Sequence, residues 1–155
     1  MFVPSAAEAS RDKPERRFLT IVFVDLIGYS TLSETLDPED LGKLQQTYQR
    51  LTLEIMERYG GFVARFVGDG ALVDFGYPRA HACGGERAVR GAIALMERLR
   101  RINPQDPDSE SNFFRAGIGI HSGFVVVAQE LMSAGASSPG IVGDAANLAA
   151  RLQAD

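Results

Sequence analysis

The chain has 155 residues, 45% of them hydrophobic and 23% charged, which is enough for one soluble domain with a substantial core. Its formal net charge of −4 provides no overall basic field, which argues against nucleic acid as a partner. The one cysteine, Cys83, cannot form an internal disulfide, and with only two histidines the chain meets no structural zinc spacing. We interpret Cys83, His81 and His121 as structural residues.

The N-terminal segment, residues 1–16, is polar, contains two prolines and lacks the apolar core of a signal peptide. We interpret it as a flexible leader to a domain that spans residues 17–155. No apolar run approaches the roughly 20 residues of a membrane span. We therefore expect a cytoplasmic protein with no membrane partner.

Residues 20–24 form a continuous β-branched and aromatic run, typical of a strand that is buried on both faces, and we expect this strand over residues 17–25. The run ends at the carboxylate Asp25, and Gly28 and a serine-rich helix start follow it. A buried charge without a partner is costly, so we expect Asp25 to bind a metal ion together with Asp69. The alternative is that Asp25 only caps the following helix.

A helix and a hairpin are predicted next. The helix starts around Pro38 and ends at Gly60-Gly61. Its apolar face repeats every three or four residues and comprises Leu41, Leu44, Tyr48, Leu51 and Ile55. Residues 62–67 and 71–75 then form two strands joined by the turn Gly68-Asp69-Gly70.

The second half of the chain predicts a helix over residues 83–101, an exposed loop over 103–112 and a strand over 113–121. The inward face of this helix is expected to comprise Val89, Ala92, Ile93, Met96 and Leu99. A turn at Ser122-Gly123 leads to another strand over 124–128, and the small residues of 133–140 suggest a mobile segment. A last helix is expected over 144–152.

The predicted order of strands and helices is that of an α+β protein with a ferredoxin-like βαββαβ core and an extra hairpin. In this fold the first strand is central and antiparallel to the third. The end of the first strand and the turn before the third then lie at the same edge of the sheet. Asp25 and Asp69 should therefore meet there.

Two carboxylates at one sheet edge suit a hard cation such as Mg²⁺ or Mn²⁺, which completes its shell with water and substrate phosphates. The backbone N–H groups of the helix start, contributed by Ile27, Gly28, Tyr29 and Ser30, would bind those phosphates. No Gly-rich loop ending in Gly-Lys-Ser/Thr is present, which excludes a P-loop site. The simpler interpretation of Gly68-Asp69-Gly70 is an ordinary hairpin turn.

Four segments together resemble the class III nucleotidyl cyclases, the catalytic domains of adenylate and guanylate cyclases. They are residues 23–30 (FVDLIGYS), 65–70 (RFVGDG), 115–123 (RAGIGIHSG) and 141–151 (IVGDAANLAAR). The resemblance covers about residues 17–155 and is greatest to bacterial cytoplasmic members in which an ATPase and helical-repeat region follows. It implies that this chain is an N-terminal fragment whose cyclase domain is incomplete at its C-terminus.

The resemblance implies a metal-dependent enzyme that forms cyclic AMP and pyrophosphate from ATP. Asp25 and Asp69 would hold two divalent ions, Mg²⁺ or Mn²⁺, of which one activates the ribose 3′-hydroxyl and the other binds the triphosphate. Asn147 would position the ribose, and Arg151 would stabilise charge on the transferring phosphoryl group. In this family these two residues come from the partner chain of a homodimer with composite active sites. Considered without the family, Asn147 and Arg151 are an exposed helical pair.

Two positions depart from the family pattern. Arg65 stands where the family has a lysine that reads the purine, and Gly140 stands where adenylate cyclases have Asp or Thr. GTP is therefore not excluded as the substrate. These departures motivate a second hypothesis, a cyclase-like domain that senses nucleotide with weak or no turnover. A diguanylate cyclase is set aside, because the hairpin has no Gly-Gly-Asp/Glu-Glu-Phe run.

Overall fold

The strand β1, Glu15–Leu26, is the centre of the fold. It pairs antiparallel with β3, Gly70–Phe75, on one side and with β4, Ala116–Leu131, on the other. The edge strands are β2, Gly61–Val67, and β5, Ser137–Val142, so the sheet has the order β2-β3-β1-β4-β5. This arrangement confirms the predicted α+β fold with a ferredoxin-like core.

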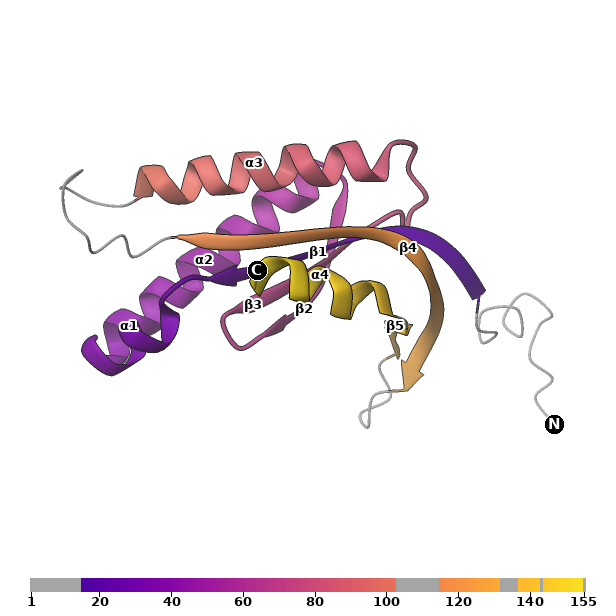
Figure 1. Cartoon of the computed structure of the whole chain (residues 1–155). Helices are drawn as coiled ribbons and strands as arrows, with labels where there is room; N and C mark the ends of the chain where they lie inside the picture. The colour runs from indigo at the N-terminus through magenta and orange to yellow at the C-terminus, as the bar shows by residue number, and fades with distance from the viewer. Residues whose placement is uncertain (1–14, 103–114, 132–136, 143, 155) are drawn as a thin grey trace.

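The computed structural model describes residues 15–102, 115–131, 137–142 and 144–154 (Figure 1). Its helices are α1, Tyr29–Thr35, α2, Pro38–Arg58, α3, Gly84–Ile102, and α4, Asp144–Ala154. Within these residues no helix combines the length and the apolar character needed to cross a bilayer. β1 begins at Glu15, inside the segment predicted to be a leader, and the predicted loop 103–112 lies outside the described residues.

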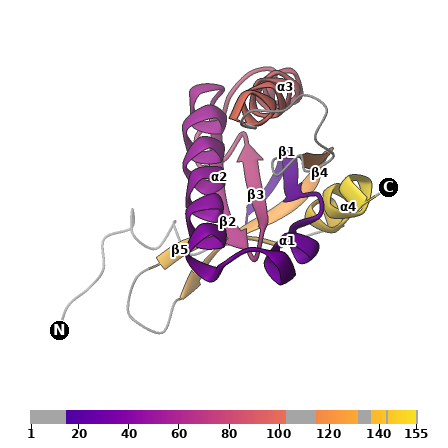
Figure 2. The same ribbon diagram turned by 90° about the vertical axis from the view of Figure 1, so that its left-hand side faces the viewer.

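The helices α2 and α3 cover one face of the sheet (Figure 2). The side chain of Asp37 caps α2 by accepting a hydrogen bond of 3.0 Å from the backbone N–H of Glu39, and Pro38 occupies the first turn as predicted. The core beneath the two helices is formed mainly by Val22, Val24, Tyr48, Leu51, Ile55, Val73, Phe75, Leu95 and Leu99.

The predicted inward face of α3 is partly wrong. Val89 and Ile93 are 46% and 53% exposed, whereas Ala88 and Leu95 are fully buried. Both sets of residues have helical spacing, so periodicity alone could not choose between them. The buried set contains small residues that let α3 lie close to α2. A Cβ on Gly91, for example, would lie only 3.3 Å from Sδ of Met56.

The strand β4 is continuous, and the predicted turn at Ser122-Gly123 is wrong. These two residues lie opposite Thr20 and Leu19 in the ladder with β1, and the hydroxyls of Thr20 and Ser122 are 2.8 Å apart in a hydrogen bond. The long central strand provides backbone partners for the whole of this segment, so the chain does not need to turn. Residues 137–140, predicted to be mobile, belong to β5 and pair with β4, while 133–136 are outside the described residues.

The helix α4 packs on the other face of the sheet, against β1 and β4 (Figures 1 and 2). Its Ala149 is buried with Leu19 and Ile21 of β1. The glycines of β4 permit this contact, because a Cβ on Gly119 would overlap the carbonyl oxygen of Ala149 and lie 2.6 Å from the backbone N of Gln153. The close packing of α4 on β4 therefore depends on glycine at Gly117 and Gly119 of the strand.

We predict that Gly119→Ala destabilises the protein by about 1–3 kcal/mol or more, because the added methyl group must displace the backbone of α4. The matched control is Gly42→Ala in α2, where a Cβ meets open space and should stabilise the helix by about 0.5–1 kcal/mol. Urea unfolding followed by circular dichroism measures both changes. A Gly119→Ala protein as stable as the wild type would show that α4 is not packed against β4 in this way.

Candidate functional site

Asp25 and Asp69 meet at the end of the central strand. The pairing of Val24 with Ala71 places the end of β1 beside the turn between β2 and β3. Gly68 has a φ of +62°, which suits glycine in this turn, and a Cβ on Gly70 would lie 3.0 Å from the ring of Phe23. The two glycines thus let the turn approach β1, so that a protonated Asp25 would hydrogen-bond to the Asp69 carboxylate. The predicted meeting of the two carboxyl groups is confirmed.

The carboxyl group of Asp25 has a raised pKa in this position. Burial, a hydrogen bond from protonated Asp25 to Asp69 and the negative charge of Asp69 together raise its pKa to about 6, against a smaller lowering by the backbone N–H of Leu26. At neutral pH the pair therefore holds two negative charges in close contact. A cation between the two carboxylates would relieve this repulsion.

The chemistry of the pair fits a magnesium-type ion. Within the described residues no group of three or more His, Cys, Asp and Glu side chains could hold a metal, so no third such side chain joins these two carboxylates. Two carboxylates are too few for a structural zinc site but are the usual protein contribution to Mg²⁺, which keeps water and substrate phosphates as its other ligands.

Two side chains of α2 support the site, and neither was singled out for this from the sequence. The Tyr48 hydroxyl donates a 3.3 Å hydrogen bond to the carbonyl of Val24, next to Asp25. Burial and the charge of Asp25 raise the pKa of Tyr48, so it remains a neutral donor. The Gln45 amide donates to the Gly68 carbonyl at 3.3 Å and accepts from the Tyr29 hydroxyl at 3.4 Å. Periodicity marks Tyr48 only as a core residue, and no local signal marks Gln45.

The predicted phosphate-binding segment needs one correction. The backbone N–H of Ile27 donates a 2.7 Å hydrogen bond to the carbonyl of Arg115, so it is not available to a phosphate. The contact between β1 and β4 continues one residue past the end of β1, which the sequence did not indicate. Gly28, with a φ of +80°, is the N-cap of α1, and Tyr29 and Ser30 begin its first turn, where backbone N–H groups have no partner inside the helix.

The other candidate residues lie on α4 and β2. Asn147 and Arg151 are exposed on α4, one turn from each other, while Ala149 between them is buried against the sheet. Among the described residues no hydrogen bond or ion pair joins them to Asp25 or Asp69. Arg65 is exposed on β2.

The family model for the adenylate and guanylate cyclase catalytic domain matches residues 12–155. This chain belongs to that family. The cyclase domain is 32% identical over 142 residues to adenylate cyclase 1 of Rhizobium meliloti, a match that covers 89% of this chain and 21% of the relative. The curated relatives it matches are much longer, since the chain spans only about a quarter of their length.

Solved cyclase structures share this fold. The guanylyl cyclase Cya2 superposes with a TM-score of 0.81 at 33% identity, covering 91% of this chain and 71% of that structure. The adenylyl cyclase CyaB from P. aeruginosa superposes with a TM-score of 0.78 at 28% identity, covering 92% of this chain and 74% of that structure. Similar structures therefore include enzymes named for each purine nucleotide.

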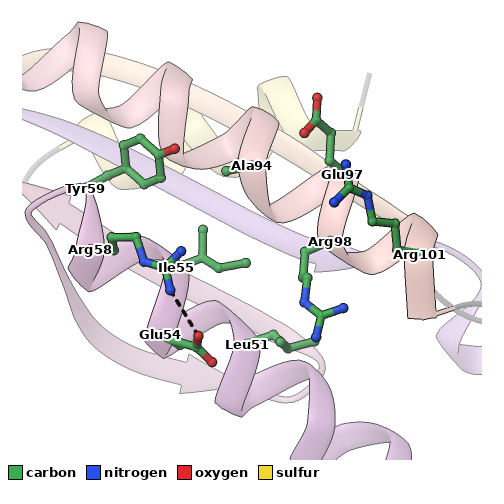
Figure 3. A pocket seen from close by; sticks show the side chains of 9 residues that line it. All are labelled: Leu51, Glu54, Ile55, Arg58, Tyr59, Ala94, Glu97, Arg98 and Arg101. Carbon is green, nitrogen blue, oxygen red and sulfur yellow. Dashed lines mark hydrogen bonds and ion pairs between the residues drawn. The ribbon is translucent and has the colours of Figure 1, made fainter.

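A groove between α2 and α3 lies away from the site of the cyclase domain. Its volume is about 140 Å³, and Figure 3 shows Arg58 of α2 and Arg98 of α3 extending into it. Arg58 forms an ion pair with Glu54, with 3.2 Å between nitrogen and oxygen. None of the candidate residues lines this groove. The carboxylate pair lies at the end of the central strand β1 and not in this groove.

We predict that Asp69→Asn raises the melting temperature of the metal-free protein at about pH 8 and changes it little at about pH 4. The native pKa of Asp25 is above its unfolded value, so native Asp25 binds the proton more tightly and stability falls as pH rises from about 4 through 6. Removing the neighbouring charge should reduce that fall. Asp74, whose pKa burial raises to about 7, contributes a fall of the same sign to both proteins.

Differential scanning calorimetry with a chelator present, over this pH range, checks the prediction. The control is Asp40→Asn, which removes an exposed acid paired with Lys43 at 3.0 Å and should not raise the melting temperature at high pH. An Asp69→Asn protein that melts at or below the wild-type temperature at about pH 8 would contradict repulsion within the pair.

Proposed function

We propose that this cyclase domain is a metal-dependent enzyme that converts ATP to cyclic AMP and pyrophosphate. The observation that carries the proposal is the contact between Asp25 and Asp69 at the end of β1. Two like charges in contact are unfavourable unless a cation binds them, and two carboxylates leave most of the cation's positions for substrate oxygens. A nucleoside triphosphate supplies such oxygens.

Asp25 and Asp69 would hold two divalent ions, Mg²⁺ or Mn²⁺. When bound, these ions would make the ribose 3′-hydroxyl a better nucleophile and neutralise the triphosphate. The bond between the 3′-oxygen and the α-phosphorus forms while the bond from that phosphorus to the pyrophosphate oxygen breaks, and the hydroxyl proton passes to water. The N–H groups of Gly28, Tyr29 and Ser30 would bind phosphate oxygens.

The remaining catalytic roles belong to α4 of a second copy of the chain. Asn147 would orient the ribose, and Arg151 would donate to the α-phosphoryl oxygens as their charge increases. Both side chains are exposed, and among the described residues no hydrogen bond or ion pair joins them to the carboxylate pair of their own chain. This placement supports a homodimer in which each site takes its carboxylates from one protomer and its α4 residues from the other.

The purine preference rests on Arg65, which would contact the base. ATP is the substrate that we propose, following relatives such as the Rhizobium adenylate cyclase, and GTP is the competing substrate, because Cya2 is a guanylyl cyclase. A location in the cytoplasm and a following ATPase and helical-repeat region also stay predictions.

A second candidate function is a nucleotide-sensing regulatory domain that binds without efficient turnover. Arg65 favours it, because a guanidinium in place of lysine presents a longer, planar donor group to the base. The two functions separate by product formation, since only the enzyme releases cyclic nucleotide and pyrophosphate.

We predict that the protein forms cyclic AMP from ATP with Mn²⁺ or Mg²⁺, and that Asp25→Asn or Asp69→Asn lowers kcat/KM by about a hundredfold or more. Chromatographic detection of cyclic nucleotide from ATP and from GTP measures both the activity and the base preference. Circular dichroism of each variant verifies that the fold is retained. Undiminished turnover in either folded variant would refute the metal assignment, and nucleotide binding without product would favour the regulatory domain.

We predict that Asp25→Asn and Arg151→Ala are each inactive alone but recover about a quarter of wild-type activity when co-expressed, because half of the dimers are mixed and have one intact site. Tagging each variant differently and purifying the mixed dimer permits a direct measurement. As a control, co-expression of Asp25→Asn with Asp69→Asn should restore nothing, since both changes affect the same half of the site. A mixed dimer as inactive as its parents would contradict the composite site.

A further inference from the structure

Asp74 is a buried carboxyl group without an evident structural purpose. It lies in the middle of β3, its side chain is only 1% exposed, and no described residue forms a hydrogen bond with its Oδ1. The other buried polar side chains of the described residues are the threonines Thr20 and Thr52, so Asp74 is the one carboxyl group among them. An unpaired buried carboxylate is costly, and its presence requires a partner or a role.

The strand register places Arg65 on the same face of the sheet as Asp74. Leu72 and Asp74 alternate with Val73 and so point away from the core beneath α2 and α3. The pairing of β2 with β3 is regular up to Val63 and then shifts at a bulge, so that Arg65 lies opposite Leu72. If the regular pairing continued without a bulge, Arg65 would lie opposite Ala71, on the face that α2 and α3 cover.

The charges of the two residues are complementary. Burial raises the pKa of Asp74 to about 7, and the positive charge of Arg65 acts in the opposite direction. Arg65 itself is exposed and belongs to none of the ion pairs found among the described residues. A guanidinium has five donors in one plane, so it can engage a carboxylate with one edge and keep other donors for a second group.

We propose that Asp74 is a positioning residue that orients the Arg65 guanidinium toward the purine base of the substrate. This proposal rests on the proposed function, in which Arg65 contacts the base. Asp74 is too deeply buried to touch the nucleotide, so it acts through the arginine. A long side chain on an edge strand has many rotamers, and an anchoring carboxylate restricts them before the nucleotide binds.

The test combines Asp74→Asn, which keeps an acceptor but removes the charge, with Asp74→Leu, which removes both. Each is made in the wild type and in Arg65→Met. In the wild-type background we expect the KM for the preferred nucleotide to rise about tenfold in Asp74→Leu and less in Asp74→Asn, with kcat within about twofold. The ratio of kcat/KM for ATP and GTP should move toward one.

In the Arg65→Met background the same changes at Asp74 should leave KM where Arg65→Met alone puts it, since nothing remains to be oriented. A purely structural role would instead change KM equally in both backgrounds. The control is Thr52→Val, which alters a buried polar side chain of α2 and should not affect KM in either background. An unchanged KM in folded Asp74→Leu, or additive effects of the two sites, would overturn the proposal.

Failure of the proposed function can be distinguished from failure of this inference. If the wild type turns over neither nucleotide, the Kd for ATP and GTP measured by titration calorimetry replaces KM, and the same non-additivity is expected. Equal Kd values for wild type and Asp74→Leu would then overturn the positioning role. Thermal unfolding of every variant verifies that affinity is compared among folded proteins.

Discussion

The contact between Asp25 and Asp69 is the constraint on which the arrangement of the site depends. Each carboxyl group is placed by the backbone, one at the end of the central strand and the other in the turn between two glycines. Burial and mutual repulsion make the pair unfavourable in isolation, as the raised pKa of Asp25 indicates. A cation bound between the two carboxylates, as we propose, would relieve this repulsion.

The central strand β1 is held firmly by its neighbours. Its residues Val22 and Val24 are fully buried, and it has strand partners on both sides. The Tyr48 hydroxyl further ties α2 to the carbonyl of Val24 beside the acidic pair. The backbone around Asp25 is thus held by packing and hydrogen bonds on several sides, which is the rigid support that the proposed metal and phosphate site would require.

The two faces of the sheet differ in the residues that line them. The face under α2 and α3 is a conventional apolar core, with buried aromatic and aliphatic side chains. The other face combines the small core around Leu19 and Ile21 with the polar residues that we connect to the nucleotide. The helix α4 lies directly on β4 there because Gly117 and Gly119 have no side chains, and this close packing leaves Asn147 and Arg151 exposed.

The sequence by itself determined the features that depend on local pattern. The apolar run of β1, the glycines around Asp69 and the order of strands and helices were enough to predict the fold and the meeting of the two carboxyl groups. Only the tertiary structure decided which of two apolar faces α3 buries, that β4 continues through Ser122, and that the N–H of Ile27 is occupied by Arg115. It also decided that a bulge turns Arg65 to the face of Asp74. Each of these depends on a partner distant in the chain, which no local spacing can identify.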